Sequence, residues 1–139
     1  LNDLAVMMGG YVSEKLTFKD ISTGASNDLK EASELARRLV TKYGMSELGP
    51  VTFGKSEELV FLGREISTEK NYSETIATKI DEEVKKFIDR AYTMAESILN
   101  KNKKALEKIA KTLIERETLE QDDFYSLLKP FRIKPVAVV

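Results

Sequence analysis

The sequence contains no histidine and no cysteine among its 139 residues. Without histidine there is no imidazole base, no Ser-His-Asp triad and no HExxH zinc pair. Without cysteine there is neither a disulfide framework nor a thiol nucleophile. Any hydrolytic chemistry in which these residues take part must be completed by side chains from outside them.

Long apolar runs and a surplus of one charge are also missing. No stretch approaches the ~20 apolar residues of a membrane helix, and the first residues do not resemble a signal peptide. Lys and Arg number 22 and Asp and Glu 23, which gives a net charge of −1. We expect no nucleic-acid partner, because phosphate contacts need a concentrated basic face. The short basic cluster of Lys101, Lys103 and Lys104 is interpreted as a solvated helix junction.

Helical periodicity is the dominant feature that is present. Hydrophobic residues make up 42% of the chain, enough for the core of one domain. Apolar residues recur at three- and four-residue spacing in segments expected to be helical at about 2–16, 26–43, 73–100, 102–116 and 118–129. The pattern predicts an all-α domain of four to five helices over residues 1–128 and a C-terminal tail at 129–139. Residues 51–62 are strand-like in composition, and a small hairpin or irregular extended chain are both open for them.

The expected helix ends carry typical signals. Ser26, Asn27 and Asp28 suit a helix start, Ser73 and Asn102 suit caps, and Thr118–Gln121 reads as a capping box. Inside the first expected helix, Gly9 and Gly10 each cost roughly 1 kcal/mol relative to alanine. We expect close approach of another helix to compensate for them.

Two carboxylates stand out by position. Residue types and spacing alone favour a helix cap for Asp28, with a metal ligand as the weaker interpretation. Glu14 lies near the carboxyl end of its expected helix, where the helix dipole disfavours negative charge. It needs a cation, a metal site or plain exposure, and exposure is the default. Asp122 and Asp123 are interpreted as structural acids in the first turn of the last helix.

A series of short blocks along the chain carries further information. The blocks are Leu4–Gly10, Ser13-Glu14, Ser22–Leu29, Ala36-Arg37, Tyr43–Ser46, Leu48–Val51, Phe61–Gly63, Asn71–Glu74 and Ile80–Val84. In this order they resemble the peptidase domain of the FtsH family, which are membrane-anchored, ATP-dependent zinc metalloproteases. The Thr-Gly-Ala-Ser-Asn-Asp stretch is the most specific block. Tyr11 and Lys15 depart from the family pattern, which has Arg and commonly a second acid there.

The resemblance implies roles for both carboxylates. In the FtsH family two His of an HExxH helix and the Asp of the Ser-Asn-Asp block bind zinc, so Asp28 would be the third zinc ligand. Glu14 would occupy the place of a carboxylate that is hydrogen-bonded to a zinc-binding His. We also expect backbone amides at the helix start to hold the second oxygen of Asp28. The family's HExxH lies upstream of the matching segment. No catalytic residue is therefore expected here, and zinc is not expected to bind this fragment alone.

For the complete protein, the resemblance implies a homohexameric zinc metalloendopeptidase that degrades protein substrates. ATP would be used by a separate domain not in this chain. Membrane contact would come only through segments absent here, with the peptidase domain on the cytosolic side of the cytoplasmic membrane. These residues would be a soluble piece, inactive alone, that supplies Asp28 and a helical scaffold. The alternative is a non-enzymatic helical interaction or oligomerisation module, and an in-frame upstream HExxH would separate the two.

Overall fold

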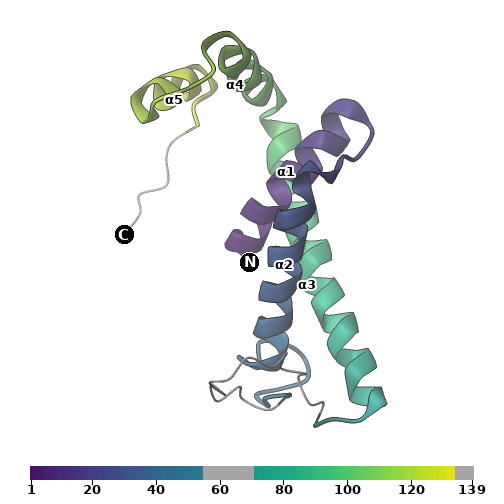
Figure 1. Cartoon of the computed structure of the whole chain (residues 1–139). Coiled ribbons are helices and arrows are strands. Elements are labelled where there is room, and N and C mark those ends of the chain that lie inside the picture. The colour runs from purple at the N-terminus through teal and green to yellow at the C-terminus, as the bar shows by residue number, and fades with distance from the viewer. Residues whose placement is uncertain (55–70, 134–139) are drawn as a thin grey trace, which may run out of the picture. The chain divides into compact units, whose positions relative to one another are not determined.

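A computed structural model describes residues 1–54 and 71–133 of the chain (Figure 1). The helices in this part are α1 (Asn2–Phe18), η1 (Thr23–Ala25), α2 (Ser26–Thr41), α3 (Glu74–Lys101), α4 (Lys103–Arg116), α5 (Gln121–Leu128) and η2 (Lys129–Phe131), where η marks a 3₁₀ helix. The two described ranges contain no strand, which confirms the all-α prediction for them. Most of the strand-like range 51–62 lies outside the described residues. None of the described helices is both long and apolar enough to cross a membrane.

The chain divides into two compact units, Leu1–Ala95 and Glu96–Val139. Helix α3 begins in the first unit and ends in the second. This division does not test the domain over residues 1–128 and the tail at 129–139 that the sequence suggested, and both stay predictions. Residues 129–131, expected to belong to the tail, form the short helix η2.

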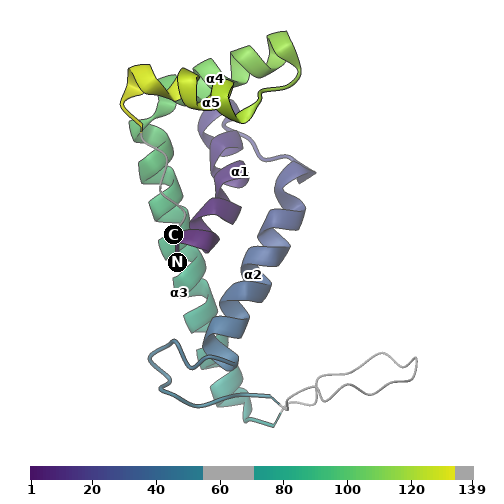
Figure 2. The same cartoon turned by 90° about the vertical axis from the view of Figure 1, so that its left-hand side faces the viewer.

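The core of the first unit lies between α1 and α2. Helix α1 lies beside α2 (Figures 1 and 2), and in the view of Figure 2 it stands between α2 and α3. Small residues on α2 allow the two helices to approach closely. The side chains of the first unit that are at most 4% exposed are Leu4, Met8 and Val12 on α1, Ala25 in η1, Ala32, Ala36 and Val40 on α2, and Ile80, Ala91 and Ala95 on α3. All of them except Ala25 and Ala95 belong to the apolar stripes expected from the periodicity. Tyr43, the last residue of the helix expected at 26–43, is not buried but 62% exposed, because α2 already ends at Thr41.

Side chains of α3 contact α2 through the Arg37–Asp81 ion pair at 2.8 Å, and they also contact α1. The Tyr11 and Tyr92 rings meet edge to face with centroids 6.4 Å apart. The Lys15 ammonium lies 5.0 Å from the centre of the same Tyr92 ring. Tyr11 and Lys15 are the two residues that depart from the family pattern. In this structure both of them contact the Tyr92 ring.

The predicted helix starts are partly right. Ser73 caps α3, since its hydroxyl accepts a hydrogen bond from the Ile76 N–H at 3.3 Å. Asn102 is the first flanking residue of α4, but its amide donates to the Ile98 carbonyl in the last turn of α3 at 2.8 Å and makes no cap bond to α4. The capping box at Thr118–Gln121 is wrong: α5 begins one turn later than expected, at Gln121, and Glu120 makes no side-chain cap bond.

In the second unit, α4 and α5 bury only three side chains, Ala105, Thr112 and Leu128. An ion pair joins the two helices, with Arg116 Nη1 lying 3.4 Å from Asp123 Oδ2. Asp123 is thus a structural acid, as the sequence indicated. Ile114 of α4 is 82% exposed, although the sequence gives it as one of the apolar residues of this helix.

Glu83 on α3 fastens the loop that follows α2. It is 7% exposed and accepts hydrogen bonds from Lys86 Nζ at 2.6 Å and from the Glu47 N–H at 3.2 Å. Lys86 also lies 3.0 Å from the Glu47 carboxylate. The hydrogen bond from Lys86 lowers the pKa of Glu83 below its ordinary value, with a further contribution from the Glu47 amide. A buried carboxylate with two donors therefore joins the loop to α3.

We predict that Glu83→Ala lowers the free energy of unfolding by about 1–3 kcal/mol at neutral pH, because two donors lose a charged acceptor. The folded-state pKa of Glu83 lies below the ordinary value of 4.5 that the unfolded chain has. The stabilisation is therefore complete above that value and is lost as the pH falls through the folded-state pKa. Urea titrations followed by circular dichroism between pH 7 and pH 3 measure this. The exposed neighbour Glu82, as Glu82→Ala, is the matched control; equal effects of the two variants would contradict the prediction.

Candidate metal-ligand site

The site is built where the chain turns from α1 into α2. Ser22 has an extended backbone, and its hydroxyl oxygen accepts a hydrogen bond from the Gly24 N–H at 3.0 Å. It thereby caps η1. Helix η1 runs directly into α2, where the Ser26 N–H donates to the Thr23 carbonyl. Asp28 consequently lies in the first turn of α2, where negative charge is favoured by the helix dipole.

Glu14 reaches from α1 to this turn. Its Oε2 accepts hydrogen bonds from the Ser22 N–H and the Ser22 hydroxyl, both at 3.0 Å, and its Oε1 lies 3.0 Å from the same hydroxyl. The sequence offered a cation, a metal site or exposure for this carboxylate. The structure gives it a partner that none of the three included, a serine eight residues further along the chain.

Asp28 makes no hydrogen bond or ion pair among the described residues, and it is only half-buried. Its Oδ2 lies against α1 at Gly10, where an added Cβ would come within 3.3 Å of it. Helix α2 starts after Ala25 and has no side-chain cap bond. The expectation that helix-start amides hold the second oxygen of Asp28 is therefore wrong, as is the reading of Asp28 as a cap. The 3₁₀ turn before α2 supplies the helix start instead.

The two carboxylates are brought to one side of α1. Asp28 lies against Gly10, and Glu14 follows Gly10 by four residues, which is one turn on the same helix face and about 6 Å along the axis. Gly24 lies beside the Glu14 carboxylate, since an added Cβ at Gly24 would come within 3.1 Å of Glu14 Oε1. The structure thus places both residues that the sequence singled out beside the same helix face, while their roles toward zinc stay predictions.

The residues present fit one corner of a zinc site and no more. A carboxylate without a partner, held next to a helix that carries no Cβ at the point of contact, suits one of the three protein ligands of a catalytic zinc ion. Among the described residues there is no group of three or more Asp, Glu, His or Cys that could hold a metal. The other ligands would have to come from residues outside the chain, because it contains no histidine.

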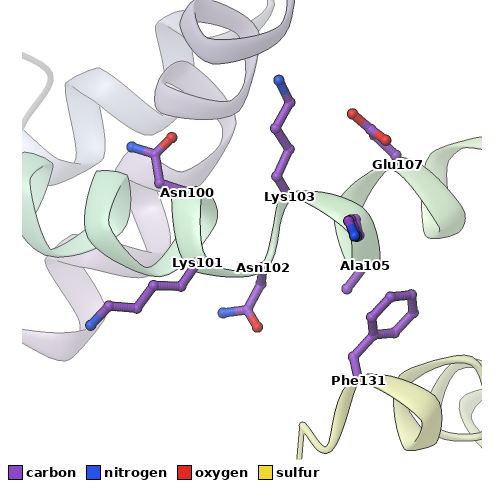
Figure 3. Close-up of a pocket in the computed structure, with 8 residues that line it drawn as sticks. Asn100, Lys101, Asn102, Lys103, Ala105, Glu107 and Phe131 are labelled. Carbon is purple, nitrogen blue, oxygen red and sulfur yellow. The ribbon is translucent and has the colours of Figure 1, made fainter.

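The second unit holds a separate pocket of about 460 Å³. Its lining includes Lys101, Lys103 and Lys104 at the junction of α3 and α4, with Phe131 from η2. Figure 3 shows the Lys101 and Lys103 side chains extending to opposite sides of the chain. All three lysines are exposed, so they do not converge on a bound anion and agree with a solvated junction.

The sequence did not identify Ser22 as a functional residue, and it did not explain why a glycine stands at position 24. A serine two residues before a glycine amide is a signal for a local side-chain turn, and it could have located the cap of η1. The bond between Ser22 and Glu14 had no such signal, because it depends on how α1 folds back toward α2.

Comparison with known proteins identifies the class and then the family. A family model matches residues 1–127, and that model describes a family of peptidases. The chain belongs to peptidase family M41.

Several relatives carry the name ATP-dependent zinc metalloprotease FtsH. The chain is 52% identical over 136 residues to FtsH 1 of Thermomicrobium roseum, which covers 97% of the chain and 21% of the relative. It is 47% identical to FtsH of Caldicellulosiruptor bescii and 46% identical to FtsH of Thermotoga maritima, each match covering 92% of the chain and 21% of the relative. The chain therefore spans about a fifth of the length of these relatives.

The two adjacent glycines of α1 give a test of this geometry. A Cβ at Gly9 would meet nothing within 4 Å among the described residues, whereas one at Gly10 would press on Asp28. We predict that Gly9→Ala raises the free energy of unfolding of the 139-residue chain by about 1 kcal/mol through helix propensity. Gly10→Ala should gain clearly less, because the Asp28 carboxylate must move. Denaturant unfolding of both variants measures the difference, and an equal gain would place Asp28 away from α1.

Proposed function

We propose that the chain is part of the peptidase domain of an ATP-dependent zinc metalloendopeptidase that degrades proteins. Asp28 supplies the acidic zinc ligand, Glu14 accepts a hydrogen bond from a zinc-binding histidine, and the helices form the scaffold that holds both. The single observation that carries the proposal is the Asp28 carboxylate, which has no hydrogen-bond or ion-pair partner among the described residues and lies against Gly10 on the side of α1 that also bears Glu14.

The proposed roles of the two carboxylates follow from the chemistry of their side chains. Zinc, when bound, would supply Lewis-acid activation of water and of the scissile carbonyl. Asp28 contributes an anionic oxygen whose position is fixed by the start of α2 and by the backbone of α1. Glu14 would fix the orientation and tautomer of a histidine ring, a role commonly filled by carboxylates next to metal-binding histidines. The histidines and the general base come from residues outside the 139.

The proposal extends to the assembly. By similarity to relatives named ATP-dependent zinc metalloprotease FtsH, the complete protein acts on protein substrates and uses ATP in a separate domain. We propose further that it forms a homohexamer anchored in the cytoplasmic membrane, with these residues on the cytosolic side.

The test replaces the ligand in the full-length protein. Asp28→Ala should lose zinc, measured by metal analysis after gel filtration, and should lose proteolysis of casein to background. ATP hydrolysis should continue, because it belongs to another domain. The matched control is Asp122→Ala, which removes an exposed acid from the first turn of α5 and should leave zinc content unchanged. Full zinc content and proteolysis in Asp28→Ala would refute the assignment.

The competing function is a non-enzymatic helical module. A second prediction concerns the 139-residue chain on its own and tests the proposed ligand set. Since this chain offers one unpartnered carboxylate at the site and no histidine, we predict that it binds zinc no better than an unrelated acidic protein and does not cleave casein. Isothermal titration with zinc and a casein assay measure this. Tight one-to-one zinc binding by the chain alone would contradict the proposed ligand set.

A further inference from the structure

We infer that Ser22 is a positioning residue of the zinc site, acting through Glu14 and through the start of α2. The inference rests on the proposed function of Asp28 and Glu14. It assigns to an uncharged side chain the task of setting where both carboxylates stand. Three independent contacts of Ser22 lead to this conclusion.

The first contacts fix the direction of the Ser22 hydroxyl proton. The hydroxyl oxygen accepts from the Gly24 N–H, which can only donate, so the hydroxyl is free to donate elsewhere. The Glu14 carboxylate, which only accepts when ionised, lies 3.0 Å away through both of its oxygens. The proton therefore points toward Glu14. A chain of hydrogen bonds from Gly24 through Ser22 to Glu14 results, and its members strengthen one another.

A third contact holds the carboxylate by the backbone. The Ser22 N–H donates to Glu14 Oε2 at 3.0 Å. With the hydroxyl, this donor restricts rotation of the carboxylate, whose remaining acceptor sites keep room for a histidine N–H. An unheld glutamate would retain several rotamers and orient a histidine less well.

Ser22 also sets the position of Asp28. It caps η1, and η1 continues without a break into α2, whose first turn carries Asp28. Because η1 runs directly from Ser22 into the first turn of α2, we expect a shift at Ser22 to displace the Asp28 carboxylate relative to Gly10. A metal site tolerates such displacement poorly, because misplacement of about 1 Å can cost large factors in function. One residue thus couples the ligand on α2 to the carboxylate on α1.

The test measures zinc affinity of the full-length protein by chelator competition, together with the visible spectrum of its cobalt-substituted form. Ser22→Ala removes the hydroxyl and should weaken zinc binding about 10-fold or more, as loss of hydrogen-bonding partners of metal ligands commonly does. Ser22→Thr keeps the hydroxyl and suits the extended backbone at this position, so it should restore the affinity and the cobalt spectrum. Ser33→Ala is the matched control, because Ser33 is an exposed serine of α2 whose hydroxyl bonds only to the Leu29 carbonyl.

A double-mutant cycle separates positioning from a general effect on stability. In a Glu14→Ala background, Ser22→Ala should weaken zinc binding clearly less than it does in the wild type, since one of its two routes to the site is gone. Equal losses in both backgrounds, or a loss that Ser22→Thr does not restore, would overturn the role through Glu14.

Asp28→Ala in the same assay distinguishes the two levels of inference. If Asp28→Ala keeps wild-type zinc affinity, the proposed function fails and the role of Ser22 fails with it. If Asp28→Ala loses zinc while Ser22→Ala binds it as the wild type does, only the role of Ser22 is overturned.

Discussion

The packing of α1 against α2 is the constraint on which the rest of the site depends. It buries Val12 and Ala32 and at the same time places Asp28 against Gly10. A side chain larger than hydrogen at Gly10 would have to displace the carboxylate, so the helix accepts a residue of low helix propensity at that point. The apolar core therefore sets the position of a polar group that contributes nothing to that core.

The helices were predictable because their information is local. Apolar spacing identified the buried faces of α1, α2 and α3, and the serine before α3 marked its start. The caps of α2, α4 and α5 were assigned wrongly, because cap bonds depend on local geometry that the apolar period does not record. A 3₁₀ turn precedes α2, the Asn102 amide bonds to the Ile98 carbonyl, and α5 begins only at Gln121. The division into two units left no trace in that pattern either, because α3 passes through it without a break.

The candidate site was predictable only in part. Family resemblance pointed to Asp28 and Glu14, and the structure brings both to one side of α1. What holds Glu14 could not be read from its neighbours in sequence, because the donors sit across a turn of the chain. Residue types also pointed the wrong way for Asp28. Ser-Asn-Asp at a helix start suits capping, yet Ser22 performs the capping and leaves the Asp28 carboxylate without a partner.

The different treatment of the two carboxylates argues for a division of roles between them. Glu14 stands near the end of α1 that disfavours negative charge, and the two donors of Ser22 offset that cost without a cation. A cation there would compete with a histidine N–H for the carboxylate, whereas a serine leaves acceptor sites open. Asp28 stands at the favourable end of α2 and needs no donor, and it makes no hydrogen bond among the described residues. This pattern supports the proposed roles, in which the acid that accepts a hydrogen bond is held by two donors and the acid that coordinates the metal is not.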